Sequence, residues 1–201
     1  MPEMSPDSFV IEHKPIGWFP LHEIAKGDVG VVFKVTDADG RVEAAMKVEK
    51  IGTNSKVANM EKNVLHAMRD EPNALHLIDY CNVGPVKCTV MTLAGPDFAV
   101  VKNLVNQKFS DATLIRVAIS SLLAIKTLHE HGYLHRDIEP ANLALSYNSN
   151  NRNIFLLDFG CARQYAKKNE QGKWVIRQPR EKVVINKWRM VRKKAKKWNG
   201  G

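Results

Sequence analysis

The first quarter of the chain alternates between apolar and polar positions. The apolar residues of one run are Val31, Phe33 and Val35, and those of the next are Val42, Ala44, Met46 and Val48. Such alternation predicts β-strands with one face in the core. Asp39-Gly40 separates the runs, and this pair favours a tight turn because both positions tolerate a positive φ. The pattern predicts an antiparallel hairpin within 19–50, and shorter apolar runs predict strands at 75–80 and 88–93.

Two longer stretches have the spacing of amphipathic helices. Within 55–69 the apolar positions recur at steps of three and four, at Val57, Met60, Val64 and Met68. Within 110–131 one face carries Leu114, Val117, Ala118, Ser121, Leu122, Ile125 and Leu128. Ser110 suits the N-cap of this second helix, and Gly132 suits the residue after its end. Because strands come first and helices follow without strict alternation, we expect an α+β fold.

Charge is unevenly distributed along the chain. The 201 residues include 30 Lys or Arg and 21 Asp or Glu, a formal net charge of +9. Nine of the basic residues and one acidic residue lie from Arg180 onward, so the remainder is nearly neutral. A basic tail on a neutral body makes nucleic acid an unlikely partner.

Membrane and secretory signals are weak in this sequence. No apolar run approaches the roughly 20 residues that a membrane span needs, so we expect no transmembrane segment. The three cysteines form no Cys-x-x-Cys pair. This spacing argues against a disulfide framework or a zinc site and favours a cytoplasmic or nuclear setting.

The motifs that carry chemistry follow one another in a fixed order. They are Gly27-Asp28-Val29-Gly30, Ala45-Met46-Lys47, Glu61, His135-Arg136-Asp137 with Asn142, and Asp158-Phe159-Gly160. Each motif alone is weak, because two glycines can form an ordinary turn and a lysine and a glutamate can both be solvated. All five in order, each on the expected kind of element, resemble a protein kinase.

The resemblance narrows to the casein kinase I superfamily, and within it to the tau-tubulin kinase-like branch that is expanded in nematodes. The segments that carry it are Met91-Thr92-Leu93-Ala94-Gly95-Pro96, the run 158–165 and Gln178-Pro179-Arg180. It implies a two-lobed Ser/Thr kinase fold, with a complete β-rich N-terminal lobe at 18–93 and a partial helical C-terminal lobe at 94–180. A flexible arm at 1–17 and a basic tail at 181–201 flank these lobes.

The resemblance also implies the cofactors, ATP and Mg²⁺, and the residues that bind them. Asp137 would orient the substrate hydroxyl and accept its proton, and Asn142 and Asp158 would hold the metal. Lys47, held by Glu61, would pair with the α and β phosphates. The other residues expected around the nucleotide are Gly27, Gly30, Val32, Ala45, Met91 as gatekeeper, Thr92 and Ala94. A protein Ser or Thr hydroxyl would accept the phosphoryl group.

Two departures from the family pattern stand out. Glu139 occupies the place of a catalytic-loop lysine, so an attraction for the γ-phosphate becomes a repulsion. The match also stops near Arg180, before the large helices that complete the C-terminal lobe, so we expect a C-terminally truncated domain that is unstable or partner-dependent. The alternative is a catalytically inactive, ATP-binding relative that acts through partners.

The tail has a pattern of its own. Val184, Trp188, Val191, Ala195 and Trp198 recur at steps of four and three among lysines and arginines. That spacing is typical of a basic amphipathic helix, which would bind an acidic partner or surface. A disordered charged end without a specific role is the simpler hypothesis.

Overall fold

The computed structural model describes residues 17–26, 30–50, 55–105, 108–148 and 153–178. Residues 1–16 of the N-terminal arm predicted at 1–17, Gly27 and the predicted basic tail lie outside these residues. The chain divides into two compact units, Met1–Tyr165 and Ala166–Gly201, and each is described by itself.

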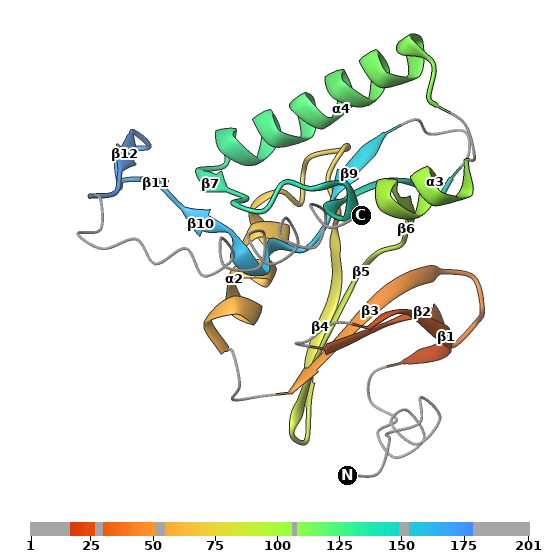
Figure 1. The fold of residues 1–201 in the computed structure, drawn as a ribbon. Coiled ribbons are helices and arrows are strands. Elements are labelled where there is room, and N and C mark those ends of the chain that lie inside the picture. The colour runs from red at the N-terminus through yellow and green to blue at the C-terminus, as the bar shows by residue number, and fades with distance from the viewer. Residues whose placement is uncertain (1–16, 27–29, 51–54, 106–107, 149–152, 179–201) are drawn as a thin grey trace, which may run out of the picture. The chain divides into compact units, whose positions relative to one another are not determined.

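A five-stranded antiparallel sheet forms the first part of the larger unit (Figure 1). Its strands are β1 (Trp18–Lys26), β2 (Gly30–Asp37), β3 (Glu43–Lys50), β4 (Leu77–Val83) and β5 (Val86–Thr92). They lie in the order β1-β2-β3-β5-β4, so β3 is central and β1 and β4 are the edges. The hairpin predicted from Asp39-Gly40 is confirmed, with Gly40 at a φ of 69°.

The two faces of β3 enter different cores, as the period of two requires. Ala44, Met46 and Val48 lie in one apolar cluster, whereas Ala45 lies in another that also contains residues of α2 (Ser55–Ala67). Lys47 and Glu49 therefore share the Ala45 side of the strand. This alternation carries two charged residues toward the helix.

The rest of the larger unit is built from short elements around one long helix. These elements are β6 (Ala94–Asp97), α3 (Phe98–Leu104), α4 (Asp111–Glu130), β7 (Tyr133–Leu134), η2 (Pro140–Asn142), β8 (Leu143–Ser146), β9 (Ile154–Leu156), η3 (Phe159–Cys161) and β10 (Arg163–Gln164). Strands β6, β8 and β9 form one small sheet, and β7 pairs with β10. One core cluster joins β3, α2, α4, β9 and η3 through Ala45, Leu65, Leu128, Phe155 and Phe159. The expected α+β class is confirmed.

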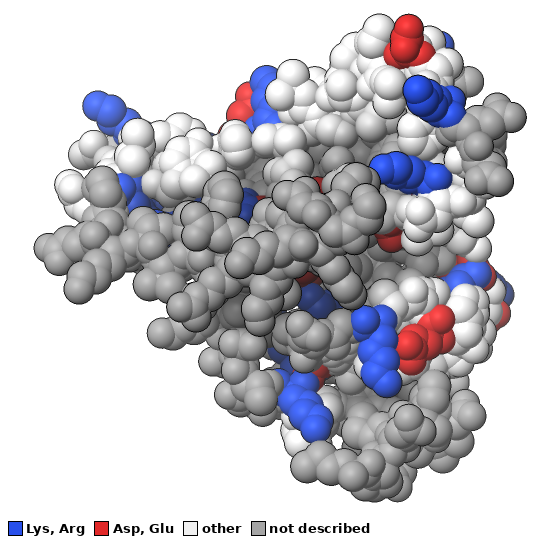
Figure 2. Space-filling view, viewed as in Figure 1, with Lys and Arg blue, Asp and Glu red and all other residues white. Residues whose placement is uncertain are grey.

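Helix α4 begins and ends as its sequence predicts. The Ser110 hydroxyl accepts a hydrogen bond from the Thr113 amide, and Gly132 has a φ of 80°. Only Ala124 and Leu128 of the helix are buried, and Leu114 and Leu122 of the predicted apolar face are 50% and 66% exposed. Figure 2 shows the surface over α4 as mostly uncharged.

The sequence predicted no transmembrane segment, but by length and mean hydropathy alone α4 could cross a membrane. This is weak support for a span, because core helices of soluble proteins pass the same test. Two of the residues on α4 pack into the core described above.

The smaller unit contains a short hairpin, β11 (Ala166–Lys168) with β12 (Trp174–Ile176). The Asn169 side chain accepts hydrogen bonds from the amides of Gln171 and Lys173 and so holds the turn.

Candidate active site

Lys47 and Glu61 form the centre of the candidate site. The Lys47 Nζ donates to Glu61 Oε2 at 2.7 Å, and Glu61 is only 4% exposed. Burial lowers the pKa of Lys47, but the negative charges of Glu61 and Glu49 outweigh burial, and its pKa is raised above the usual value. The lysine is therefore held charged and in a defined position.

The local sequence explains why this pair meets. Glu61 lies three and four residues before Val64 and Leu65, so these three share the buried face of α2, and Met68 just after the helix is buried as well. The same packing that buries the apolar residues carries the carboxylate into the core beside β3. A lone carboxylate there would be costly, and Lys47 supplies its counter-charge.

Asp158, which follows β9, also lies beside this pair. Buried strand β9 precedes it, and Phe159 after it is buried against the ring of His135 at a centroid distance of 5.4 Å. Asp158 has a φ of 56° and accepts a hydrogen bond from the Gly160 amide. Its Oδ1 lies 3.9 Å from the Lys47 Nζ. The strained turn thus presents an exposed carboxylate to the lysine.

Hydrogen bonds of both backbone and side-chain groups fix the loop that carries Asp137 and Asn142. The His135 ring bonds to the Leu157 carbonyl at 2.9 Å, and the Leu157 amide donates to the Asn142 carbonyl at 3.0 Å. The Asn142 Nδ2 donates both to the backbone carbonyl and to the Oδ2 of Asp137, at 2.9 and 3.0 Å. The loop is therefore bonded to the residue that precedes Asp158.

The polar atoms of this loop fit a hard cation. Both hydrogen bonds that the buried Asn142 side chain makes to described residues use its nitrogen, so they leave the oxygen to a ligand. Carboxylate and amide oxygens are the ligands that Mg²⁺ prefers, and Asp158 offers an exposed carboxylate. Asn142 and Asp158 would hold the ion.

The other residues expected around the nucleotide lie in strands and already pair with neighbouring strands. Ala45 pairs with Met91 across β3 and β5, and both are buried. Val32 of β2 lies opposite Lys47 of β3. The Thr92 amide already donates to the His76 carbonyl, and Ala94 pairs with Ser146 in the small sheet. The carbonyl is therefore the group of Thr92 that an adenine could use.

Gly30 has a packing reason to be glycine. A Cβ there would lie 2.3 Å from the Val48 carbonyl oxygen. The close approach of β2 and β3 thus requires glycine, whatever the residue does for a phosphate.

Comparisons with known proteins agree with this geometry. The protein kinase domain family matches residues 19–188. The chain belongs to this family. A putative serine/threonine-protein kinase of Caenorhabditis elegans is 33% identical over 82% of the chain and 48% of its own length. Casein kinase I homolog 1 of Saccharomyces cerevisiae is 30% identical over 71% of the chain and 27% of its length.

A probable serine/threonine-protein kinase of Dictyostelium discoideum is similar too, with 29% identity over 74% of the chain and 30% of that protein. The chain therefore spans less than half the length of these relatives. The β-sheet with α2, followed by the helical part, corresponds to a partial two-lobed kinase fold.

Glu49 and Lys87 belong to none of the sequence motifs, and Arg136 of the His135-Arg136-Asp137 motif makes a contact that the motif did not predict. The Arg136 Nε donates to the Cys161 carbonyl at 2.7 Å and so joins the catalytic loop to η3. Glu49 lies 3.7 Å from Lys47, and Lys87 lies 3.3 Å from Glu49. The period of two along β3 could have placed Glu49 beside Lys47, but no motif indicated Lys87.

Glu139 is exposed and its side chain caps no helix.

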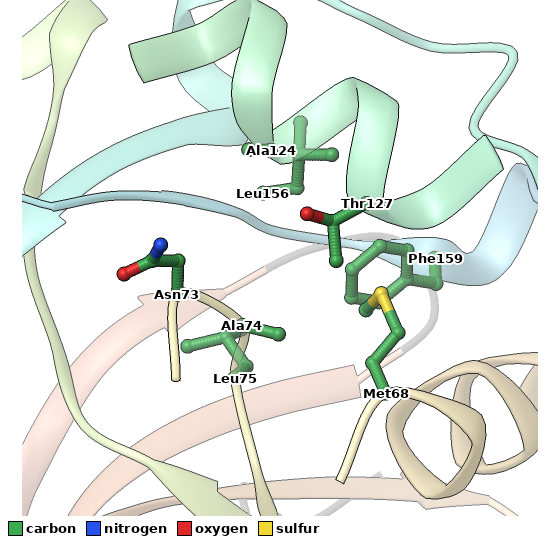
Figure 3. A pocket seen from close by; sticks show the side chains of 8 residues that line it. All are labelled: Met68, Asn73, Ala74, Leu75, Ala124, Thr127, Leu156 and Phe159. Carbon is green, nitrogen blue, oxygen red and sulfur yellow. The ribbon is translucent and has the colours of Figure 1, made fainter. Parts of the chain in front are cut away.

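A small hollow lies behind Phe159, between the end of α2 and α4 (Figure 3). Met68, Leu75, Ala124 and Leu156 are among its lining residues. Its volume of about 10 Å³ is close to the space of one water, so it is a packing gap in the kinase core and far too small for a nucleotide.

Proposed function

We propose that this kinase domain transfers a phosphoryl group from Mg·ATP to a Ser or Thr hydroxyl of a protein. The observation that carries the proposal is the convergence of Lys47, Glu61 and Asp158, which come from β3, α2 and the turn after β9. The similarity to Ser/Thr kinases of three organisms supports it.

Each residue has a role that its surroundings support. Phosphoryl transfer depends mainly on positioning and on the stabilisation of negative charge. Mg·ATP supplies the reactive phosphoryl group when it is bound. Lys47, fixed by Glu61, donates to phosphate oxygens, and Asn142 and Asp158 provide oxygen ligands for the metal. Asp137, oriented by Asn142, accepts the proton of the substrate hydroxyl.

Within the family we propose a casein kinase I type. The 30% identity to the yeast casein kinase I homolog supports this type, as does the run from Met91 to Pro96. The tau-tubulin kinase-like branch rests on the sequence motifs alone. An acidic protein such as casein is therefore the first substrate to test.

Binding of Mg·ATP, measured by calorimetry on the 201-residue chain, tests the proposal. Lys47→Ala and Asp158→Ala should each weaken binding by about tenfold or more, since each removes a charge-assisted contact worth about 1.5–3 kcal/mol. Lys126→Ala is the matched control, because this exposed lysine pairs with Glu130 on α4 and with no other acidic residue in the described part of the chain. Equal affinities for the wild type and both site variants would refute the site.

Transfer of radiolabelled phosphate from ATP to casein distinguishes an enzyme from a nucleotide-binding relative. Asp137→Asn should abolish transfer while nucleotide binding is kept, because Asp137 acts on the acceptor hydroxyl. Binding without any transfer by the wild type would favour the inactive alternative, for which Glu139 provides the physical reason.

A further inference from the structure

A second buried carboxylate lies beside the lysine of the site. Glu49 is 2% exposed, and its Oε1 lies 3.7 Å from the Lys47 Nζ. Glu61 and Asp158 lie 2.7 and 3.9 Å from the same nitrogen. One ammonium thus faces three carboxylates, and only one of these pairings, with Glu61, joins β3 to α2.

Glu49 has a cation of its own. Lys87 is 5% exposed, and its Nζ lies 3.3 Å from the Glu49 Oε2. The two residues lie directly opposite each other in the register of β3 and β5, so the backbone holds them together. Among the described residues neither carboxylate oxygen of Glu49 receives a hydrogen bond. The charge of Glu49 is therefore balanced by the ammonium groups of Lys87 and Lys47.

Lys87 and Lys47 are the two cations that form ion pairs with Glu49 among the described residues, so Lys47 is the one left if Lys87 is removed. A buried carboxylate needs a counter-charge, and the long side chain of Lys47 can turn toward Glu49 on its own strand or toward Glu61 on α2. Glu49 would then compete with Glu61 for the same ammonium. The helix would lose its tie to β3, and the phosphate-binding amine would leave its place.

We propose that Lys87 is a positioning residue of the nucleotide site, which keeps the Lys47 ammonium on Glu61 by neutralising Glu49. The role in nucleotide binding rests on the proposed function, whereas the competition between Glu49 and Glu61 belongs to the protein without ligand.

Nucleotide affinity of Lys87→Met gives the first test, measured by calorimetry with a non-hydrolysable Mg·ATP analogue. If Lys47 pairs with Glu49 nine-tenths of the time, the apparent Kd rises about tenfold. The double variant Glu49→Gln/Lys87→Met removes the competing charge together with its partner, and its Kd should return to within about twofold of the wild-type value. Lys34→Met, which breaks a 2.7 Å ion pair with Glu43 on the same sheet, is the matched control and should leave the Kd unchanged.

Amide hydrogen exchange without nucleotide gives the second test. Lys87→Met should accelerate exchange in α2, within Met60–Ala67, because Glu61 loses its counter-ion, and the double variant should restore protection. A purely structural Glu49–Lys87 pair predicts instead faster exchange confined to β3 and β5. That result, or a Lys87→Met protein with wild-type affinity, would overturn the proposal.

The milder variant Lys87→Gln keeps the test decisive if Lys87→Met does not fold. It keeps a hydrogen-bond donor opposite Glu49 but removes the positive charge that neutralises this carboxylate. A purely structural contact predicts unchanged affinity and unchanged exchange in α2, whereas our proposal predicts about a tenfold loss of affinity and faster exchange in the helix. If the wild type binds no nucleotide, the proposed function fails, and the exchange of α2 alone decides for or against the role of Lys87.

Discussion

Among the residues of the candidate site, Glu139 is the one whose charge is least suited to phosphoryl transfer. The side chain is exposed, near the acceptor-binding Asp137 in sequence, and caps no helix. At about 6 Å and an effective dielectric near 20, one pair of unit charges is worth roughly 3 kcal/mol, so a reversed charge would cost on the order of 5 kcal/mol. Water and the metal would screen part of this repulsion.

Glu139→Lys should therefore raise the rate of phosphate transfer by about tenfold or more, a fraction of the three to four decades that the full energy would give. Initial rates with casein at saturating Mg·ATP measure the effect. The rate of phosphate transfer by Glu139→Gln should lie between the rates of the wild type and of Glu139→Lys. Unchanged turnover in both variants would show that this side chain does not approach the reacting phosphate.

Cys88 offers a separate test of how tightly the sheet is packed. It is fully buried, and burial raises the pKa of its thiol to about 12. Only thiolates react with iodoacetamide. At pH 8 Cys88 should therefore be alkylated about three decades more slowly in the folded protein than in urea, where the pKa of the thiol is near 9.0. Mass spectrometry of the peptide that contains Cys88 measures both rates.

The dependence on pH has a definite sign. Folding raises the pKa of the Cys88 thiol. While the thiol is protonated in both the folded and the unfolded state, its ionisation does not affect the free energy of unfolding. Once the thiol ionises in the unfolded chain, it lowers that free energy. The unfolded thiol titrates near 9.0 and the folded one near 12, so the free energy of unfolding should fall as pH rises through that window. An alkylation rate of Cys88 that is the same in the folded and the unfolded protein would contradict its buried position.

At the scale of elements, the parts of the fold fixed by local physics were predictable. The Asp39-Gly40 hairpin, the Ser110 cap and the positive φ of Gly132 follow from turn and capping chemistry. The helix predicted at 55–69 ends at Ala67, and the strand predicted at 75–80 begins at Leu77, because Glu71 and Ala74 form a turn between them. Such ends depend on competing local bonds.

Features that depend on a partner distant in the sequence were not predictable. The Lys87–Glu49 pair requires the register of β3 against β5, which the pattern of either strand alone does not contain. The donation of the Thr92 amide to His76 has the same origin. The motifs predicted the meeting of Lys47, Glu61 and Asp158 only because their order resembles a known family.

Which apolar residues of α4 are buried could likewise not be predicted from the sequence alone. Its periodicity predicts one apolar face but not what covers it, and the structure buries Ala124 and Leu128 while Leu122 stays 66% exposed. Leu122→Gln should leave the free energy of unfolding within about 0.5 kcal/mol of wild type. Leu128→Ala should lose about 2–5 kcal/mol, because it leaves a cavity. Urea denaturation of both variants, read by circular dichroism, makes the comparison, and equal losses would show that α4 is covered.

For the whole molecule, the exposed face of α4 bears on stability more than the active site does. Its half-exposed or more exposed apolar side chains are Leu114, Ile115, Ile119, Leu122 and Leu123. At about 25 cal/mol per Å², several hundred Å² of apolar surface left in water corresponds to roughly 10 kcal/mol of stabilisation not gained. Native domains have a margin of only about 5–15 kcal/mol.

We therefore expect the 201-residue chain by itself to bind ANS, to self-associate at micromolar concentrations and to unfold over a broad temperature range. Sedimentation velocity, ANS fluorescence and calorimetry measure these three properties on one preparation. Leu122→Gln with Ile119→Gln should reduce both ANS binding and association, because the two changes remove apolar surface without touching the core. A monomeric wild-type protein that binds no ANS and unfolds in a sharp transition would mean that this face costs the molecule little, and that the other contacts of α4 suffice to hold it.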